Sequence, residues 1–386
     1  MDPRRNPFSP GAGTPPPELA GRDRLREEVA IALHRIAAGR TAQSRILYGL
    51  RGVGKTVLLN EIRLEAEADG IAIIMIEAPE NRSLPAVLAP ALRAALLRMN
   101  RLLAAGDAVQ RALKALAGFI RLKASYADIE LAMEIDPEPG LADSGDLESD
   151  LADLVRSVGE AARAGQTAAA IFIDELQYVA QDQLAALITA LHRAGQARLP
   201  VTLVGAGLPQ LLGQMGHAKS YAERLFVFEP VGPLDADAAR EAIEDPIEAE
   251  GESITPAAIA AIFRETRGYP YFLQEWGKQA WDIAEKSPIG QDDVAAASPA
   301  ALAQLDASFF RVRFDRMTPA EKRYVRAMAG LGEGPHRSGD IADALGVKVT
   351  SVAPLRSALI AKGMIYSPNH GDTAFTVPMF DAFMRR

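Results

Sequence analysis

Gly49-Leu50-Arg51-Gly52-Val53-Gly54-Lys55-Thr56 decides the fold of this 386-residue chain. The stretch fits the pattern Gly-x-x-x-x-Gly-Lys-Ser/Thr, in which x is any residue. The apolar residues 46–48 before it predict a short strand, and residues 57–62 after it predict the start of a helix. In that setting backbone N–H groups wrap a triphosphate, and the helix N-terminus adds the positive end of its dipole. A glycine-rich turn that happens to contain a lysine is the alternative, which the flanking strand and helix disfavour.

Two side chains of this loop have specific expected roles. Lys55 would reach the β- and γ-phosphates, and the Thr56 hydroxyl would be a ligand of Mg²⁺. The remaining nucleotide contacts are expected along the loop itself, from Gly49, Gly52, Val53, Gly54 and Val57. The sequence therefore predicts that ATP and Mg²⁺ are bound.

The bulk composition is that of an ordinary globular protein, with 48% hydrophobic and 24% charged residues. The absence of cysteine excludes disulfides and thiolate metal sites. No apolar stretch approaches the roughly 20 residues needed to span a bilayer, and the N-terminus lacks a hydrophobic signal core. We therefore expect a cytoplasmic protein without a membrane partner.

Charge is distributed unevenly along the chain. The overall net charge of -8 argues against a surface covered throughout in nucleic-acid-binding charge. From Arg311 onward the chain contains twelve Lys or Arg and seven Asp or Glu, so this segment has a net charge of +5 and the rest of the chain has -13. Such asymmetry favours a polyanion-facing C-terminal part, although basic residues also merely solvate helix faces.

Composition along the chain predicts its organisation. Residues 1–17 are rich in Pro and Gly and are expected to form a disordered leader. From residue 18 to 230, helical and strand-like runs alternate, which indicates an α/β fold with a parallel sheet. The predicted strands are residues 45–48, 71–77, 169–173, 200–204 and 225–228, and their apolar character suits strands buried on both faces.

Two further regions are predicted to be largely helical. Between residues 81 and 165 we expect helices at 85–105, 107–119 and 146–164, and a half-exposed strand at 129–135. This insertion is interpreted as a structural cover over the sheet rather than a lid that binds a partner. Residues 233–300 are helical and acidic, with breaks expected at Pro246, at Pro256, at 268–270 and at 287–288.

Acidic residues follow the third predicted strand. Ile171-Phe172-Ile173 is followed at once by Asp174 and Glu175, and ligands of open α/β folds bind at the carboxyl ends of such strands. Asp174 would hold the Mg²⁺ hydration shell, and Glu175 would orient or deprotonate the attacking water. The alternative is an acidic N-terminus of the next helix, where negative charge is favourable in any case.

Together these motifs resemble the AAA+/STAND side of the P-loop ATPases, above all the archaeal-type and origin-recognition ATPases. Residues 18–28 resemble the segment of that family that precedes the first helix and lies against adenine, which implicates Leu19, Ala20, Gly21 and Arg22. Residues 266–274 resemble the Gly-x-Pro helix start of the family's lid, so that Pro270 would face the base and Arg267 would sense the γ-phosphate. The tyrosines and phenylalanine there are equally well explained as core residues.

The chain departs from this family pattern at two places. The predicted strand 200–204 continues into Gly205-Ala206-Gly207 and lacks the polar sensor residue of AAA+ proteins, which favours slow hydrolysis. The arginine that would act on a neighbouring subunit is ambiguous. We select Arg224 as the catalytic arginine finger, with an ordinary surface arginine as the alternative.

The C-terminal segment resembles a winged helix-turn-helix. Thr318-Pro319-Ala320-Glu321 is a capping box that opens a helix to about residue 331, and further helices are predicted at 338–345 and 350–362. Strand-like runs at 364–366 and 373–377 would form the wing. If double-stranded DNA is bound, the third helix enters the major groove. The expected contacts are Arg337, Lys348, Ser351, Arg356, Lys362 and His370.

The predicted fold is thus a P-loop parallel-sheet ATPase core at 18–230, followed by a helical lid at 231–305 and a winged helix-turn-helix domain at 306–386. The leading hypothesis is an ATP-binding and ATP-hydrolysing switch that controls a DNA-binding domain. The alternative is a signalling or defence scaffold whose winged helix binds protein and whose nucleotide controls oligomerisation. A small-molecule phosphotransferase is disfavoured because no feature indicates an acceptor pocket.

Overall fold

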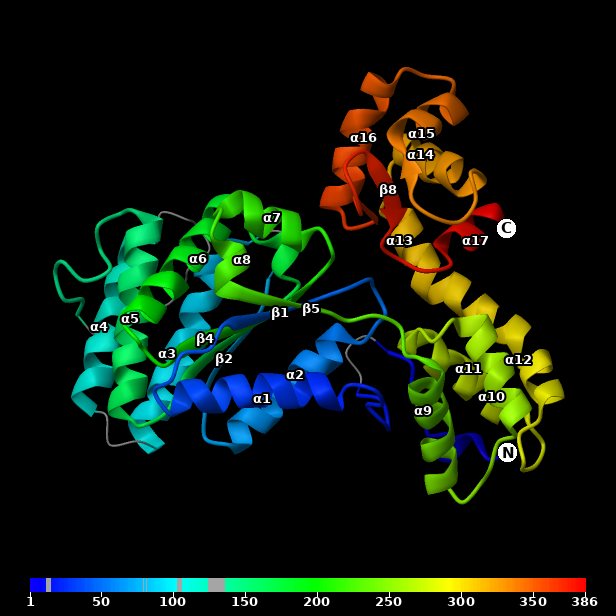
Figure 1. Ribbon diagram of the computed structural model, residues 1–386, viewed down its shortest axis with the longest axis horizontal. Coiled ribbons are helices and arrows are strands. Elements are labelled where there is room, and N and C mark those ends of the chain that lie inside the picture. The colour runs from blue at the N-terminus through cyan, green and yellow to red at the C-terminus, as the bar shows by residue number, and fades with distance from the viewer. Residues whose placement is uncertain (12–14, 79, 81, 103–105, 124–135) are drawn as a thin grey trace. The chain divides into compact units, whose positions relative to one another are not determined.

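The computed structural model describes residues 1–11, 15–78, 80, 82–102, 106–123 and 136–386. The chain forms two compact units (Figure 1). Residues 24–48 and 58–230 make up the sheet unit, and residues 1–23, 49–57 and 231–386 make up the helical unit. The phosphate loop belongs to the helical unit, although it is continuous in sequence with a strand and a helix of the sheet unit.

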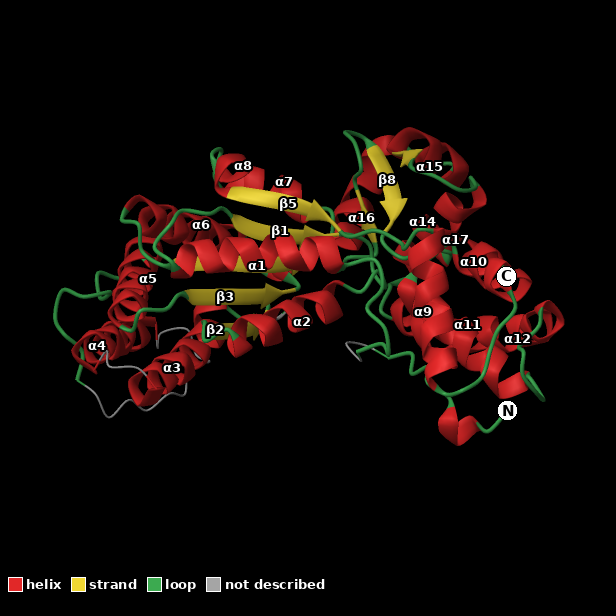
Figure 2. Ribbon diagram, turned by 60° about the horizontal axis from the view of Figure 1, so that its bottom comes forward, coloured by secondary structure: helices red, strands yellow, loops and turns green. Residues whose placement is uncertain are grey.

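A five-stranded parallel sheet is the centre of the sheet unit (Figure 2). Its strands are β1 (Ser44–Tyr48), β2 (Ala72–Glu77), β3 (Ala169–Asp174), β4 (Val201–Gly207) and β5 (Phe226–Pro230). Their order is β2-β3-β4-β1-β5, and every pairing is parallel. All five predicted strands are present, and every residue of β3 and β4 is buried, as their apolar sequence predicts.

The helices of the sheet unit follow the strands in an alternating order. They are α1 (Asp23–Ala37), α2 (Lys55–Ala68), α3 (Leu84–Leu102), α4 (Gly106–Lys123), α5 (Leu147–Ala164), η2 (Leu176–Tyr178), α6 (Gln181–Gln196), α7 (Leu211–Ala218) and α8 (Ala222–Leu225). The three predicted helices of the insertion are confirmed as α3, α4 and α5. Helix α3 packs on β2, α4 packs on α3 and α5, and α5 packs on α6, as a structural cover requires. The strand predicted at 129–135 lies outside the described residues.

The helical unit continues from residue 231 to the C-terminus. Its elements are α9 (Ala236–Ala249), α10 (Pro256–Thr266), α11 (Pro270–Ile283), α12 (Gln291–Gln304), the π-helix η3 (Leu305–Phe310), α13 (Arg311–Asp315), α14 (Pro319–Gly330), β6 (His336–Arg337), α15 (Ser338–Leu345), α16 (Val349–Ala361), β7 (Ile365–Tyr366), β8 (Asp372–Phe375) and α17 (Phe380–Arg385). One hydrophobic core runs through it, with Trp276, Phe310 and Tyr324 fully buried. Strands β6 and β7 pair on either side of β8 in an antiparallel sheet.

Two sequence predictions for the helical unit are wrong. Pro246 does not break a helix: it lies inside α9 and is buried, so packing offsets the one helical hydrogen bond that its missing N–H removes. Residues 1–11 of the expected disordered leader are ordered and include η1 (Pro3–Arg5). Phe8 is 3% exposed, and the Trp281 indole donates to the Asp2 carbonyl at 2.9 Å. A single buried aromatic and a few backbone contacts therefore order a segment whose composition indicates disorder.

Within the described ranges no single helix is long and apolar enough to cross a membrane. In the same ranges α15 and α16 together, bent by 112° at the break between them, would be long and apolar enough.

Candidate nucleotide site

The phosphate loop connects β1 to α2, as the sequence predicts, and its glycines are required by geometry. Gly52 and Gly54 have φ values of +83° and +87°, in the left-handed region that disfavours other residues. A Cβ atom at Gly49 would lie 2.0 Å from the Val231 carbonyl oxygen, so no larger side chain fits. Helix α2 begins at Lys55 and directs the N–H groups of its first turn toward the loop. The loop therefore has the shape and the donors of an anion-binding cradle.

Lys55 and Thr56 occupy different environments at the start of α2. The Lys55 side chain is largely buried, and its ammonium group donates to the carbonyls of Gly49 at 2.9 Å and Leu50 at 2.8 Å. Thr56 is exposed to solvent. A phosphate chain in the loop would have to take over hydrogen bonds that the loop's own carbonyls now accept from Lys55.

Two other segments of the helical unit contact the loop. The Arg22 guanidinium donates to the carbonyls of Val53 at 3.3 Å and Gly232 at 2.5 Å. Burial lowers the pKa of Arg22 from its ordinary value, and the charge of Asp235 partly opposes this shift. The N–H group of Tyr271, the second residue of α11, donates to a carbonyl of the loop at 3.2 Å. The structure thus brings together the N-terminal motif, the phosphate loop and the start of α11.

The rest of the predicted base-binding residues belong to the same two segments. Ala20 is buried and Leu19 is half-buried. Gly21 has a φ of +67°, and a Cβ there would lie 2.7 Å from that of Ala238. Pro270 is the first residue of α11, where its missing N–H leaves no hydrogen bond unmade.

The predicted acidic pair lies where β3 ends. Asp174 is 5% exposed and accepts a hydrogen bond from the Glu175 N–H at 2.8 Å. Glu175 adopts the left-handed conformation, with a φ of 52°, and precedes η2. Strand β4 lies between β3 and β1, all three running in parallel, so the acidic pair follows β3 at the same sheet edge at which β1 ends.

The donor set suits magnesium better than a tightly held transition metal. Mg²⁺ takes oxygen ligands, keeps several waters and is usually bound by one or two protein oxygens together with substrate phosphates. The Thr56 hydroxyl and the Asp174 carboxylate are such oxygens. No group of three or more His, Cys, Asp or Glu that could hold a metal occurs in the described part of the chain. Each of these two oxygens is of a ligand type that Mg²⁺ accepts.

Gln177 is a buried polar residue that sequence reasoning missed. Its side chain reaches both the Glu175 carboxylate and the backbone of Leu208, just beyond β4. The sequence shows only that a glutamine, Gln177, stands two residues after the acidic pair and that a glycine, Gly207, ends β4. Neither feature indicates a contact between them without the sheet order.

The two predicted arginines have different surroundings. Arg224 is exposed on the short helix α8. Arg267 ends α10 with a φ of 53°, and its guanidinium forms an ion pair with Glu333 at 2.5 Å. The hydrogen bond with Glu333 raises the pKa of Arg267 and lowers the pKa of Glu333. As a γ-phosphate sensor, Arg267 would have to exchange this carboxylate for a phosphate.

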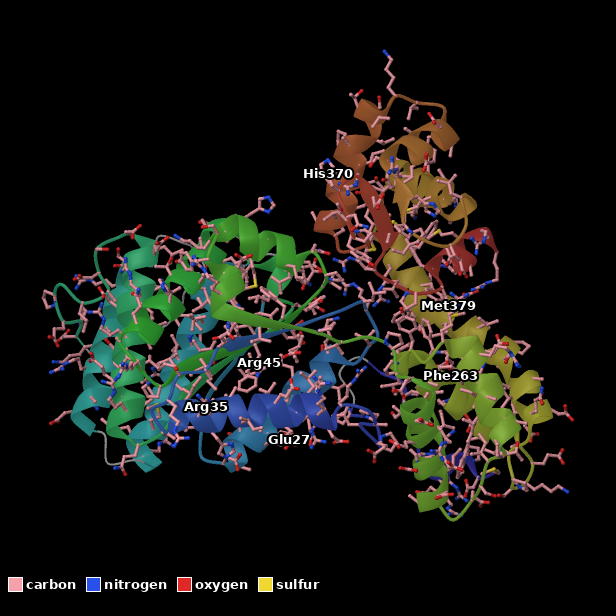
Figure 3. The ribbon with its side chains drawn as sticks, viewed as in Figure 1. Glu27, Arg35, Arg45, Phe263, His370 and Met379 are labelled. Carbon is pink, nitrogen blue, oxygen red and sulfur yellow. The ribbon has the colours of Figure 1, made fainter. Side chains whose placement is uncertain are left out.

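The six residues predicted to contact DNA fall into two groups. Arg337, Lys348, Ser351 and His370 are exposed, and His370 lies in the turn between β7 and β8 (Figure 3). Arg356 instead donates to Thr373 at 2.9 Å, to Ser367 at 2.8 Å and to the Asp372 carbonyl at 2.9 Å. Lys362 donates to the buried Glu321 carboxylate at 2.7 Å.

Comparison with known proteins finds family models that are similar to two parts of the chain. Residues 18–204 match the family described as AAA ATPase domain, and residues 307–384 match one described as Domain of unknown function (DUF8462). A search of curated proteins finds no match.

Similar solved structures cover almost the whole chain. A Walker-type ATPase of Pyrococcus abyssi is 16% identical with a TM-score of 0.59, covering 98% of this chain and 99% of that one. The Orc1 protein of Aeropyrum pernix in complex with DNA is 16% identical with a TM-score of 0.47, covering 96% and 93%. The RuvB Holliday junction branch migration motor of Thermotoga maritima is 15% identical with a TM-score of 0.47, covering 95% of each chain. At such identities the likeness concerns the fold alone.

Residues 18–204 are therefore similar to an AAA ATPase domain, and the parallel sheet with its helices matches the α/β core of a P-loop ATPase. The family match supports nucleotide-dependent ATPase activity. The fold likeness to the Walker-type ATPase agrees with that class.

Proposed function

We propose that this protein is a slow, Mg²⁺-dependent ATPase whose nucleotide state controls its C-terminal domain. The observation that carries the proposal is the pairing of two motifs on one fold. A glycine-rich loop follows β1 and leads into the helix that begins with Lys55. An acidic pair ends β3, a buried strand of the parallel sheet to which β1 also belongs.

Each residue of these motifs has a defined part in the proposed reaction. Lys55 and the loop N–H groups would bind the β- and γ-phosphates. Thr56 and Asp174 would hold Mg²⁺, which neutralises charge that develops on the transferred phosphoryl group. Glu175 would accept a proton from the attacking water or orient it. Slow turnover is expected because β4 ends in glycine and supplies no polar sensor side chain of its own.

The nucleotide is proposed to sit against the segments that already contact the loop. Leu19 to Arg22 and the start of α11 at Pro270 would face the base. Arg267 would sense the γ-phosphate after releasing Glu333. Arg224 would act as an arginine finger on a neighbouring copy, which requires a homo-oligomer.

Contacts within the helical unit support control of the C-terminal domain by the nucleotide. The Arg51 N–H of the loop donates to the Thr376 carbonyl at 2.9 Å, and the Arg51 side chain donates to the Gly363 carbonyl at 3.4 Å. A phosphate that reshapes the loop would compete with these bonds. ATP binding and hydrolysis would thereby change how residues 306–386 are presented, as γ-phosphate contacts do in other nucleotide switches.

The proposed domains are an ATPase core at 18–230, a helical lid at 231–305 and a winged helix-turn-helix at 306–386. The third assignment is supported by three helices, α14, α15 and α16, followed by the β7–β8 hairpin. Helix α16 would be the recognition helix, and the exposed Arg337, Lys348 and His370 would contact DNA phosphates.

A protein partner is the second candidate, and a specific observation favours it. Val347 and Val349, on either side of Lys348, are 44% and 50% exposed at the start of α16. Arg356 and Lys362 are already engaged within the domain, so fewer cations are available to a phosphate backbone. Exposed valines at this position suit an apolar partner surface better than a groove of DNA.

Two experiments test the proposal. Lys55→Ala should abolish ATP binding, and Glu175→Gln should retain binding while turnover falls about a hundredfold. Equal turnover in wild type and Glu175→Gln would refute the assigned base.

The partner of the C-terminal domain is tested by fluorescence anisotropy with duplex DNA at two salt concentrations. Lys348→Ala is the variant, and Lys286→Ala, which changes an exposed lysine elsewhere, is the control. Weak DNA binding that does not depend on salt and is unchanged in Lys348→Ala would favour a protein partner.

A further inference from the structure

A buried amide links the proposed general base to the end of the neighbouring strand in the sheet unit. Gln177 is 5% exposed. Its Nε2 donates to Oε2 of Glu175, and its Oε1 accepts from the Leu208 N–H at 2.9 Å. Both ends of one side-chain amide are thus occupied, one by the acid that follows β3 and the other by the backbone that follows β4.

The direction of this amide is set by its partners. The Leu208 N–H is a donor and requires the oxygen of Gln177 to face it. The amide nitrogen must then face Glu175, where it donates to the carboxylate. The opposite orientation would set two donors against each other at Leu208, so the contact with Glu175 is specifically N–H to carboxylate.

Gly207 provides the room for this arrangement. A Cβ atom at Gly207 would lie 2.8 Å from Oε1 of Gln177 and 2.8 Å from a methyl carbon of Leu211. Such distances are shorter than ordinary van der Waals contact. The missing polar side chain at the end of β4 therefore has a structural explanation, because the Gln177 amide occupies the space beside it.

The backbone around Glu175 is held as firmly as its side chain. Glu175 has a φ of 52°, in the left-handed region that disfavours residues with a Cβ atom. Its N–H donates to Asp174 at 2.8 Å, and the Gln177 carbonyl accepts from Gln214 at 3.3 Å. A strained position that is fixed by several hydrogen bonds is typical of a residue whose orientation matters to function.

We propose that Gln177 is a positioning residue that orients the Glu175 carboxylate for hydrolysis and connects it to the end of β4. This inference rests on the proposed function, in which Glu175 is the general base. Gln177 would act through Glu175 and not on the nucleotide itself. Its N–H fixes one carboxylate oxygen, and the carboxylate can then present its other oxygen in a constant direction.

Three variants separate positioning from packing. Gln177→Glu keeps an oxygen for the Leu208 N–H but replaces the donor toward Glu175 by a negative charge. Gln177→Met keeps the length of the side chain and removes both hydrogen bonds. Gln196→Met, at an exposed position near the end of α6, is the matched control.

The readouts are ATP binding by calorimetry and steady-state ATP turnover. Both Gln177 variants should bind ATP within about twofold of wild type and lose about 10- to 100-fold in kcat, with KM unchanged, because misplacement of a catalytic group by ~1 Å costs this much. Gln196→Met should match wild type. Because Gln177→Glu leaves Leu208 satisfied, it still tests the proposal if Gln177→Met does not fold.

A double-mutant cycle with Glu175→Gln completes the test. Where the base is already absent, adding Gln177→Met should slow turnover less than twofold further, since no base remains to be positioned. An undiminished effect of Gln177→Met in that background, or wild-type kcat in Gln177→Glu, would overturn the positioning role. If instead Glu175→Gln itself leaves turnover unchanged, the proposed function fails and the Gln177 role fails with it.

Discussion

Lys362 distinguishes a structural cation from a DNA contact, and its loss has a calculable effect. Its ammonium group lies 2.7 Å from a Glu321 carboxylate oxygen and 3.2 Å from the Arg316 carbonyl oxygen. The Glu321 side chain is only 4% exposed, whereas that of Lys362 is 33% exposed. Lys362→Met would therefore leave a buried carboxylate without its counter-charge.

The magnitude follows from this burial. Removal of one partner from a fully buried ion pair costs about 3–5 kcal/mol. Because water reaches Lys362, and because Glu321 keeps its capping bond from the Thr318 N–H, we expect about 2 kcal/mol. With a denaturant slope of about 3 kcal/mol per M, the urea midpoint of the helical unit should fall by about 0.7 M.

Tryptophan fluorescence is the appropriate assay. The only two tryptophans, Trp276 and Trp281, are buried in α11. They belong to the same core as Tyr324 of α14, so their emission reports unfolding of the helical unit. Lys348→Met, which changes an exposed lysine nearby, is the control and should shift the midpoint by less than 0.2 M, or about 0.5 kcal/mol.

Two further measurements make this prediction refutable. Glu321→Gln in the Lys362→Met background should recover part of the loss, because the unpaired charge is gone. Burial raises the pKa of Glu321, but hydrogen bonds from Lys362 and Thr318 outweigh it and leave the pKa below its ordinary value of 4.5. A carboxylate whose pKa is lowered in the folded state stabilises the fold at pH values above its ordinary pKa, and this stabilisation is lost as the pH falls. The difference in urea midpoint between wild type and Lys362→Met should therefore shrink below pH 4.5. A Lys362→Met midpoint equal to that of Lys348→Met would refute the reasoning.

The helical unit offers two other predictions. Phe8→Ala should detach the N-terminal segment and cost about 3 kcal/mol of stability, because the Phe8 ring is buried against Gly277. A Cβ atom added at Gly277 would lie 2.9 Å from that ring. Hydrogen exchange at residues 1–11 should rise in the variant, and unchanged exchange would contradict the packing. Burial raises the pKa of Glu275, although the hydrogen bond from the Gln279 amide acts in the opposite direction. Ionisation of Glu275 therefore destabilises the fold as the pH rises above the ordinary pKa of a glutamate. Glu275→Gln should therefore raise the urea midpoint at pH 7 and have little effect below pH 4, and a lower midpoint at pH 7 would show that the charge is stabilising.

Local sequence signals account for much of what the structure shows. The phosphate loop, the buried strands β3 and β4 and the acidic pair were predictable because each depends on neighbours within about ten residues. The same holds for the Thr318 capping box, in which Glu321 and Thr318 exchange hydrogen bonds at 2.6 and 3.3 Å.

The parts that sequence reasoning missed depend on contacts between distant segments. Gln177 is informative only once β3 and β4 are known to be neighbours. Residues 1–11 are ordered by Trp281 and its surroundings, more than 250 residues away. Lys362 and Arg356 were predicted as DNA contacts because the sequence shows their charge but not the acceptors they already have.

The binding of Mg-ATP to the phosphate loop is the central claim, and calorimetry tests it most directly. The wild-type protein, titrated with Mg-ATP, should give a saturable binding isotherm with one site per chain. Lys55→Ala should give none, because the side chain that would reach the β- and γ-phosphates is gone. Absence of binding heat in the wild type, or equal affinity in Lys55→Ala, would contradict the account.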